Sequence, residues 1–187
     1  DGDNLSPITE AKGNLAFLDS LPTALIHQLS PHARMAIIEP GGGLDVLAAL
    51  RHDAQEITAI ESNPLVAQVV GERFGEFAGG IYQQQKVKVV LENGRSYLRR
   101  SNEKFDIVQL SLTDAFRVVA SGAYSLSENY LYTTQAFLDY LDHLTDQGML
   151  AISRWLQTPP SETTRIGALA VSALLASGAE DPSQHII

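Results

Sequence analysis

Two acidic residues and a pair of glycines stand where the first two strand-like segments of the chain end. The first apolar run leads to Glu39, and Gly41 and Gly43 follow before a helical pattern begins. Glycines let a backbone approach a ligand closely, and the start of a helix carries free N–H donors. The next apolar run ends at Glu61, where a carboxylate can bind the two hydroxyls of a ribose. These residues predict a site for a cofactor that contains adenosine.

The spacing of the glycines separates two kinds of cofactor. A dinucleotide site requires the pattern G-x-G-x-x-G, but Val46 occupies the position of the third glycine. A valine there would hold the helix away from the strand and from the phosphates. The remaining pattern of Glu39, Gly41 and Gly43 is typical of S-adenosylmethionine sites, whose ligand has no phosphate. A glycine-rich turn without a ligand is the alternative, and Glu61 at the next strand end favours a ligand.

The composition limits the partners of the chain. It has 187 residues, enough for one domain with a substantial core, and a formal net charge of −9. With 13 Lys and Arg against 22 Asp and Glu, it lacks the basic face that nucleic acid requires, so we expect no nucleic-acid partner. An acidic surface favours a small cationic substrate. The chain has no cysteine and its five histidines are scattered, so we also expect no metal site.

Strand-like and helical patterns alternate along the chain. The strand-like runs lie at residues 35–39, 57–61, 86–91, 105–110 and 148–153. Helices are predicted after Asn63 and Pro64, after Asn93 through Leu98, at 133–144 and at 161–177, with a helical lead-in around 15–29. This alternation predicts a doubly wound α/β domain, in which helices cover both faces of a mostly parallel sheet. We place the lead-in at residues 1–30 and a single globular domain at 31–187. No apolar run approaches the roughly 20 residues of a membrane span.

Two of the predicted helices carry apolar stripes. The helix after Pro64 is expected to bury Leu65, Val66, Val69, Val70 and Phe74. The helix at 133–144 is expected to bury Phe137, Leu138, Leu141 and Leu144. Because these residues recur with a helical period, the stripes predict that both helices pack against the sheet.

A long segment without a clear pattern, from Ser111 to about residue 129, follows the fourth strand. Ligands of open α/β sheets bind beyond the carboxyl ends of the strands, so this segment is expected to lie over the site. It carries Asp114 and Tyr124, and Tyr130 follows it. The two tyrosines are expected to line a substrate pocket, although aromatic residues in such segments also simply pack. Trp155, at the end of the fifth strand, is expected in the wall of the site.

Four blocks of the sequence resemble the spermidine/spermine synthase family. They are IIEPGGGLDVLAALRH, ITAIESNPLV, ENGRSYLRRSNEKFDIVQLSLTD and SLSENYLYTTQAFLDYLDHLTDQGMLAISRW. These polyamine aminopropyltransferases have the class I S-adenosylmethionine methyltransferase fold, which is Rossmann-like. The similarity covers about residues 35–155 and is strongest to synthase-like proteins whose domain follows a membrane-embedded region. The resemblance therefore implies a cytoplasmic domain, with a membrane region possible in the full-length protein.

The resemblance implies a nearly complete shell for S-adenosylmethionine or decarboxylated S-adenosylmethionine. The residues assigned to this shell are Glu39, Gly41, Gly43, Asp45, Glu61, Ser62, Asn93 and Gly94. The glycine motif would hold the aminopropyl or methionine end of the ligand, and Glu61 would bind the ribose hydroxyls. Asn93 stands where the family has an aspartate that contacts the adenine amine, and its side-chain oxygen can still accept that bond. Asp45 either faces the cationic amine of the ligand or is an acidic residue that the helix dipole favours.

The amine half of the family's site is altered in this chain. The fourth strand of the family ends in an Asp-x-x-Asp pair; Asp114 matches the second aspartate, whereas Ser111 replaces the first. An aminopropyltransferase must deprotonate an attacking amine, and a carboxylate can accept that proton whereas a serine cannot at neutral pH. The polyamine-lining tyrosine, histidine and glutamate of the family are also missing; Phe17, Leu18 and Asp19 lie in that region. Ser111 and Asp114 are the candidate catalytic positions.

Three functions are consistent with these residues. The first is a transferase of polyamine biosynthesis that moves an aminopropyl group to an amine acceptor, with Asp114 orienting the amine or accepting from it. The second is a methyltransferase with the same cofactor shell and another acceptor. The third is a ligand-binding domain without catalysis in a larger membrane protein, which the replacement at Ser111 makes credible.

The chain shows five full strands, whereas the methyltransferase fold is expected to have seven. We therefore expect a piece of a longer protein, truncated at both ends, whose C-terminal strands are missing. Such a piece should have an unpaired sheet edge, and exposed edges recruit partners. This predicts a homo-oligomer.

Overall fold

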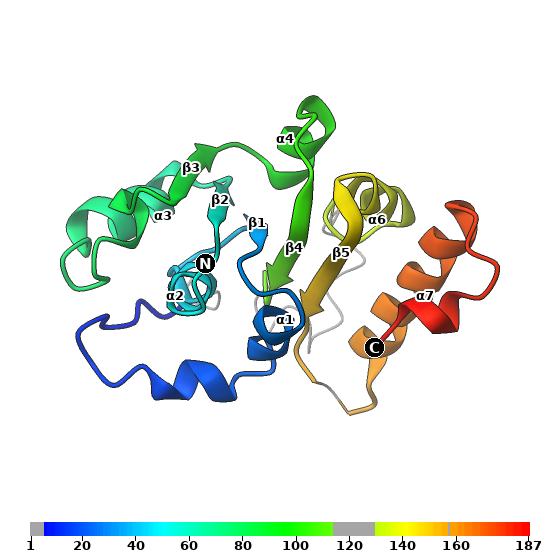
Figure 1. Cartoon of the computed structure of the whole chain (residues 1–187), viewed down its shortest axis with the longest axis horizontal. Helices are drawn as coiled ribbons and strands as arrows, with labels where there is room; N and C mark the ends of the chain where they lie inside the picture. Colours follow the sequence, from blue (N-terminus) through cyan, green and yellow to red (C-terminus); the bar gives the residue numbers. More distant parts are fainter. Residues whose placement is uncertain (1–5, 114–129, 157) are drawn as a thin grey trace.

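The computed structural model describes residues 6–113, 130–156 and 158–187, which form one parallel sheet with helices on both faces (Figure 1). The strands are β1 (Arg34–Ile38), β2 (Glu56–Glu61), β3 (Val87–Leu91), β4 (Phe105–Ser111) and β5 (Leu144–Ser153). The α-helices are α1 (Ala24–Leu29), α2 (Leu44–Arg51), α3 (Pro64–Gln68), α4 (Gly94–Arg100), α6 (Thr134–Leu141) and α7 (Ser161–Ala176). Shorter helical turns are η1 (Ala16–Ser20), η2 (Val69–Arg73), η3 (Ile81–Gln83) and η5 (Pro182–His185). The doubly wound α/β prediction is confirmed.

The order of the strands in the sheet is β3-β2-β1-β4-β5, and every neighbouring pair is parallel. The chain winds outward from β1 to β3, then crosses back so that β4 lies on the other side of β1. Ligands of open α/β sheets bind at such a reversal, beyond the carboxyl ends of the strands. The topology therefore points to the ends of β1 and β4 as the place of a site.

The strands bury both of their faces, because side chains alternate along each strand. In β1, Met35 and Ile37 belong to a core that the lead-in, α2, η2 and η3 cover. Ala36 and Ile38 belong to a second core beneath α4, α6 and α7. Leu18 of the lead-in is fully buried in the first core, so this segment packs against the sheet. The expected domain boundary at residue 30 stays a prediction.

The start of β5 corrects one expectation. Residues 133–144 were expected to be helical, but α6 ends at Leu141 and β5 begins at Leu144, four residues before the predicted strand. The backbone explains the early change, since the N–H of Phe105 donates to the carbonyl of His143 at 2.8 Å. The chain is thus already hydrogen-bonded alongside β4 when it reaches Leu144, which pairs with Phe105.

The expected stripe of the helix after Pro64 is also wrong in part. Val70 is buried, but Leu65 is 67% exposed and Phe74 is 41% exposed. Asn63 caps the helix by accepting from the N–H of Leu65, as the sequence suggested. The helix then changes to a π-helical turn at Val69–Arg73, with a hydrogen bond from the N–H of Phe74 to the carbonyl of Val69. This wider turn moves Phe74 off the stripe.

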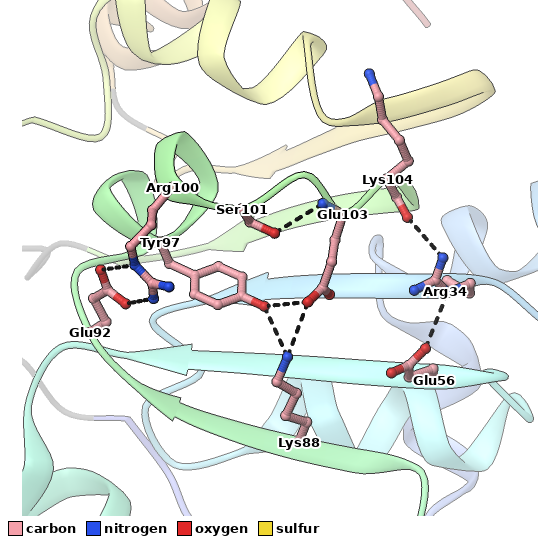
Figure 2. Close-up of polar contacts among 9 residues, drawn as sticks. All are labelled: Arg34, Glu56, Lys88, Glu92, Tyr97, Arg100, Ser101, Glu103 and Lys104. Atoms are coloured by element: carbon pink, nitrogen blue, oxygen red, sulfur yellow. Dashed lines mark hydrogen bonds and ion pairs between the residues drawn. The ribbon is translucent and has the colours of Figure 1, made fainter.

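Charged side chains tie the amino ends of the strands together, and Figure 2 shows the main group of them. Arg34 at the start of β1 contacts Glu56 at the start of β2 at 3.1 Å. Lys88 of β3 contacts Glu103, just before β4, at 3.1 Å, and both reach the hydroxyl of Tyr97 on α4. We call Arg34, Glu56, Lys88, Tyr97 and Glu103 the amino-end network. One ion pair joins β1 to β2, and the other joins β3 to the segment just before β4. Both lie toward the amino ends of the strands, away from the carboxyl ends where the topology places a site.

Two further features of the fold bear on the expectations. Within the described residues β5 pairs with β4 alone, so the sheet has an edge there, while self-association stays a prediction. None of the helices in the described part of the chain is long and apolar enough to cross a membrane.

Candidate functional site

A cavity of about 1060 Å³ lies at the carboxyl ends of the strands, where the strand order reverses. The predicted site residues in its lining are Glu39, Gly41, Asp45, Glu61, Ser62, Asn93, Ser111 and Tyr130. Trp155 also lines it, as expected. Asp114 and Tyr124 lie outside the described residues. The structure thus brings together residues from the ends of three strands, from α2 and from the turns that follow β2 and β3.

Glu61 is held firmly at the end of β2. One carboxylate oxygen accepts from the N–H of Gly41 at 3.2 Å, and the other accepts from the N–H of Asn63 at 2.9 Å. The side chain is almost fully buried, at 3% exposed. Carboxylate oxygens have about four lone-pair positions, so two backbone bonds leave capacity for the hydroxyls of a ribose.

The glycine turn after β1 is not arranged as a phosphate cradle. The N–H of Gly41 donates to Glu61, and the N–H of Gly42 donates to the hydroxyl of Ser6 at 2.7 Å. Gly42 has no room for a side chain, because an added Cβ would lie 2.2 Å from the carbonyl oxygen of Pro7. The turn's donors therefore bind protein atoms, which agrees with a ligand that has no phosphate.

Glu39 faces Glu61 across the mouth of the turn. One of its carboxylate oxygens accepts from the N–H and the hydroxyl of Ser62, at 3.3 and 2.9 Å. Its backbone has φ of +53°, a left-handed conformation that is strained for a residue with a side chain. Burial and then the charge of Glu61 raise the pKa of Glu39 to about 7. Near neutral pH the carboxyl of Glu39 is therefore protonated part of the time.

Asp45, in the first turn of α2, forms a polar cluster with β4. Its side chain is 9% exposed, and it lies close to Ser111 and Gln109. The amide nitrogen of Gln109 also donates to the oxygen of Ser111 at 3.1 Å. Burial raises the pKa of Asp45 to about 6, and the polar groups of Ser111 and Gln109 oppose this rise only in part. The residue that departs from the family pattern, Ser111, thus sits beside a buried carboxyl.

Three of the assigned cofactor residues have structural duties as well. Gly43 and Gly94 do not line the cavity; an added Cβ would lie 2.3 Å from Ile81 and 2.4 Å from Ile38, respectively. They let α2 and α4 begin close to the core. Asn93 lines the cavity and caps α4 by accepting from the N–H of Ser96 at 3.2 Å. A bond from its side-chain oxygen to an adenine amine would use the second lone pair.

The sequence reasoning missed part of the cavity wall. Ser6 and Pro7 line it, and no sequence signal marked them because their role depends on packing against a distant turn. Arg154 follows the carboxyl end of β5 and also lines the cavity. It pairs with Glu162 at 2.6 Å and lies 4.2 Å from the centre of the Tyr132 ring. Its place directly after a strand end was a signal that could have found it.

The charge of the cavity suits a cation. Its carboxyls are Glu39, Asp45 and Glu61, and Arg154 is the one lysine or arginine that lines it among the described residues. Glu162 neutralises Arg154, since both side chains are buried against each other. In the described residues no group of three His, Asp or Glu side chains could hold a metal ion. The cavity therefore offers carboxylate acceptors to a positively charged ligand.

Comparisons with known proteins identify the family of the chain. The model of the spermine/spermidine synthase domain matches residues 24–153. A polyamine aminopropyltransferase of Korarchaeum cryptofilum is 32% identical over 95 residues, which cover 51% of this chain and 29% of the relative. The chain spans at most about half the length of the first curated relatives it matches.

Solved structures show the same fold. A spermidine synthase from Thermotoga maritima has a TM-score of 0.59 at 16% identity, over 87% of this chain and 51% of that chain. An S-adenosylmethionine-dependent methyltransferase from Agrobacterium tumefaciens has a TM-score of 0.50 at 14% identity, over 80% and 47% of the two chains. At such low identity these likenesses show a methyltransferase-like, Rossmann-like fold alone.

Proposed function

Because the chain belongs to the spermine/spermidine synthase family, we propose that it binds decarboxylated S-adenosylmethionine or S-adenosylmethionine and transfers an aminopropyl group to an amine. The observation that carries the proposal is the set of carboxyls in the cavity. Glu61 is oriented by two backbone N–H groups, while Glu39 and Asp45 have no lysine or arginine beside them among the described residues that line the cavity. A sulfonium and an ammonium are both cations, and this cavity favours both.

Each side chain has a defined part in the proposal. Glu61 accepts from the ribose hydroxyls, and Asn93 accepts from the adenine amine. Gly41 lets the ligand approach the turn, and Ser62 keeps Glu39 in place through two hydrogen bonds. Tyr130 lines the cavity where the acceptor would enter. In the described residues these positions fit an adenosine with a positively charged sulfur.

The reaction is a displacement at the carbon next to sulfur. The amine nitrogen forms a bond to that carbon, the carbon–sulfur bond breaks, and its electron pair stays on sulfur as a neutral thioether. Most of the rate enhancement comes from holding two reactants in line. Asp114 would orient the amine, as the resemblance implies, and Ser111 takes the place of the family's first aspartate.

Titration calorimetry tests which adenosine ligand the chain prefers. We expect decarboxylated S-adenosylmethionine to bind more tightly than S-adenosylmethionine, and methylthioadenosine to bind as the product. Mass spectrometry of a reaction with putrescine then tests the transfer itself. A preference for S-adenosylmethionine, with methyl transfer, would favour the methyltransferase alternative, which uses the same cofactor shell.

The replacement at Ser111 favours one more candidate, a ligand-binding domain without catalysis. Binding of the adenosine ligands with no turnover of any amine would support that candidate. Failure of all three ligands to bind would contradict the assignment of the cavity.

A further inference from the structure

A short segment of the lead-in lies across the glycine turn that follows β1. We call residues 6–11 the strap. At its start, the hydroxyl of Ser6 accepts from the N–H of Gly42 at 2.7 Å. At its end, the N–H of Ala11 donates to the carbonyl of Phe77 at 3.0 Å. The strap is thus fastened at both ends, and its first residues form part of the cavity wall.

Two glycines of the turn make room for the strap. A Cβ added to Gly41 would lie 2.5 Å from the hydroxyl oxygen of Ser6, and one added to Gly42 would lie 2.2 Å from the carbonyl oxygen of Pro7. Both distances are shorter than any contact between atoms that are not bonded, so a side chain at either position would push the strap away. The close fit of the turn is therefore a fit to the chain's own backbone.

The strap takes up the last N–H group of the glycines in this turn. The N–H of Gly41 donates to Glu61 at 3.2 Å, and the N–H of Gly43 donates to a carbonyl within the turn at 2.9 Å. The N–H of Gly42 has Ser6 as its acceptor. A backbone N–H has a single proton to donate, so all three groups are in use. Of the three acceptors, the Ser6 hydroxyl is the one that the strap supplies.

The charges around the turn make this hydrogen bond matter for an anionic group. Glu39 and Glu61 line the cavity on either side of the turn, and Asp45 adds a carboxyl in the first turn of α2. Arg154, the one lysine or arginine of the described lining, pairs with Glu162 at 2.6 Å. A carboxylate bound near the turn would lose its water among these carboxyls with no N–H of the glycines to replace it.

We propose that Ser6 is a specificity-determining residue of this cavity. Its hydroxyl occupies the N–H of Gly42 that a carboxylate would need, so the cavity rejects the carboxylate of S-adenosylmethionine and admits the decarboxylated ligand. This inference rests on the proposed function. The two ligands share their adenosine, sulfonium and amino groups and differ by the carboxylate alone. Contacts elsewhere in the cavity therefore bind them alike, and the strap discriminates between them.

Calorimetric titration of the unmodified protein and of Ser6→Ala tests this inference. Ser6 is exposed, so the variant removes the hydroxyl without disturbing the core, and it leaves the N–H of Gly42 without its acceptor. S-adenosylmethionine should then bind about tenfold more tightly than to the unmodified protein, the lower end for a hydrogen bond to a charged group. The affinity for decarboxylated S-adenosylmethionine should stay the same, so the preference for it should shrink by the same factor.

Two controls separate this role from a merely structural one. Methylthioadenosine has neither the amino group nor the carboxylate, so it reports whether the cavity is intact, and its affinity should be the same in Ser6→Ala. Ser20→Ala changes an exposed serine at the end of η1 that does not line the cavity, and it should bind all three ligands as the unmodified protein does. Loosening of the strap would alter all three affinities together, whereas the proposal expects a change for S-adenosylmethionine alone.

Three outcomes would overturn the inference. S-adenosylmethionine could bind Ser6→Ala no more tightly than the unmodified protein. It could bind the variant more weakly, which would mean that the Ser6 hydroxyl donates to the carboxylate. All three affinities could also fall together, which would make the strap a structural element only. In each case the unmodified protein still binds the adenosine ligands, so the proposed function stands. If the unmodified protein binds none of them, the proposed function fails and the inference fails with it.

Discussion

Strand β2 begins and ends with a glutamate, and the two have opposite surroundings. Glu56 contacts the guanidinium of Arg34 at 3.1 Å, and its side chain is 45% exposed (Figure 2). Glu61 is buried, accepts hydrogen bonds from the backbone N–H groups of Gly41 and Asn63, and faces a second carboxyl, Glu39. At the amino end of the strand a carboxylate is paired with a cation, whereas at the carboxyl end two carboxyls lie side by side.

The contrast extends across the sheet. At the amino ends, the hydrogen bond from Lys86 lowers the pKa of Asp53, and the hydrogen bonds that Lys88 donates to Tyr97 and Glu103 raise the pKa of Lys88. At the carboxyl ends, burial raises the pKa values of Glu39 and Asp45. Paired ions stabilise their charged forms, whereas buried carboxyls without a cation are destabilised when charged. The carboxyl ends of the strands, where the carboxyls are not paired with cations in the described residues, are thus the end that suits a positively charged ligand.

The largest expected effect is a loss of ligand affinity when Glu61, but not Glu56, is replaced. Glu61→Ala should weaken binding of methylthioadenosine by about 1.5–3 kcal/mol, the range for hydrogen bonds to a charged group. Glu56→Ala changes the same residue type at the other end of the strand and should leave the affinity unaltered. Calorimetric titration measures both. Equal affinities in the two variants would remove Glu61 from the ribose site.

Replacing Gly94, which follows the carboxyl end of β3, tests the packing of the core separately from ligand binding. In Gly94→Ala the new Cβ would lie 2.4 Å from Ile38, which is fully buried, so the free energy of unfolding should fall by about 1–3 kcal/mol. Gly167→Ala is the matched control, because nothing lies within 4 Å of its Cβ and it is inside α7. That change should raise stability by up to about 1 kcal/mol. Urea unfolding compares them, and an undisturbed Gly94→Ala would contradict the packing role.

The pH dependence of stability should have opposite signs at the two ends. The pKa of Asp45 is about 6 in the folded protein and about 4 in the unfolded chain. Ionised Asp45 therefore destabilises the fold, and the free energy of unfolding falls as the pH rises from about 4 to about 6. Asp45→Asn removes this titration. The free energy of unfolding of that variant, relative to the unmodified protein, should therefore increase by about 1 kcal/mol between pH 5 and pH 8. A constant difference would show that Asp45 has an ordinary pKa.

Glu103→Gln should give the smallest effect, with the reverse sign. Burial of Glu103 raises its pKa, but the hydrogen bonds from Lys88 and Tyr97 outweigh this and lower it. Its stabilising contribution is therefore present above about pH 4 and is lost as the pH falls below that. The variant should lose less than about 1 kcal/mol at pH 8, because the pair is partly exposed, and less at high salt. A larger loss would mean that the amino-end network acts as a unit.

Local patterns were enough to predict the parts of the site that depend on strand ends. Glu39 and Glu61 follow apolar runs, and parallel strands bring such positions to one edge of the sheet. The helices after Asn63 and Asn93 were also predicted, and in the structure each asparagine caps its helix.

Features that depend on contacts between residues far apart in the chain could not be predicted from the sequence. Nothing near Gly43 or Gly94 shows that Ile81 and Ile38 occupy the space of a side chain there. The π-helical turn that exposes Phe74 and the early start of β5 also follow from tertiary packing. The placement of Asp45 and Ser111 in one cavity is of this kind, because one residue comes from α2 and the other from β4.

The raised pKa of Glu39 has a consequence for the order of events at the cavity. A ligand with a positive charge favours the ionised carboxyls, so its binding near neutral pH would expel a proton into solution, and its apparent affinity would rise with pH. When the sulfur loses its charge on transfer, that preference disappears. Glu39 then takes up a proton again, and the neutral thioether is held less tightly than the donor it came from.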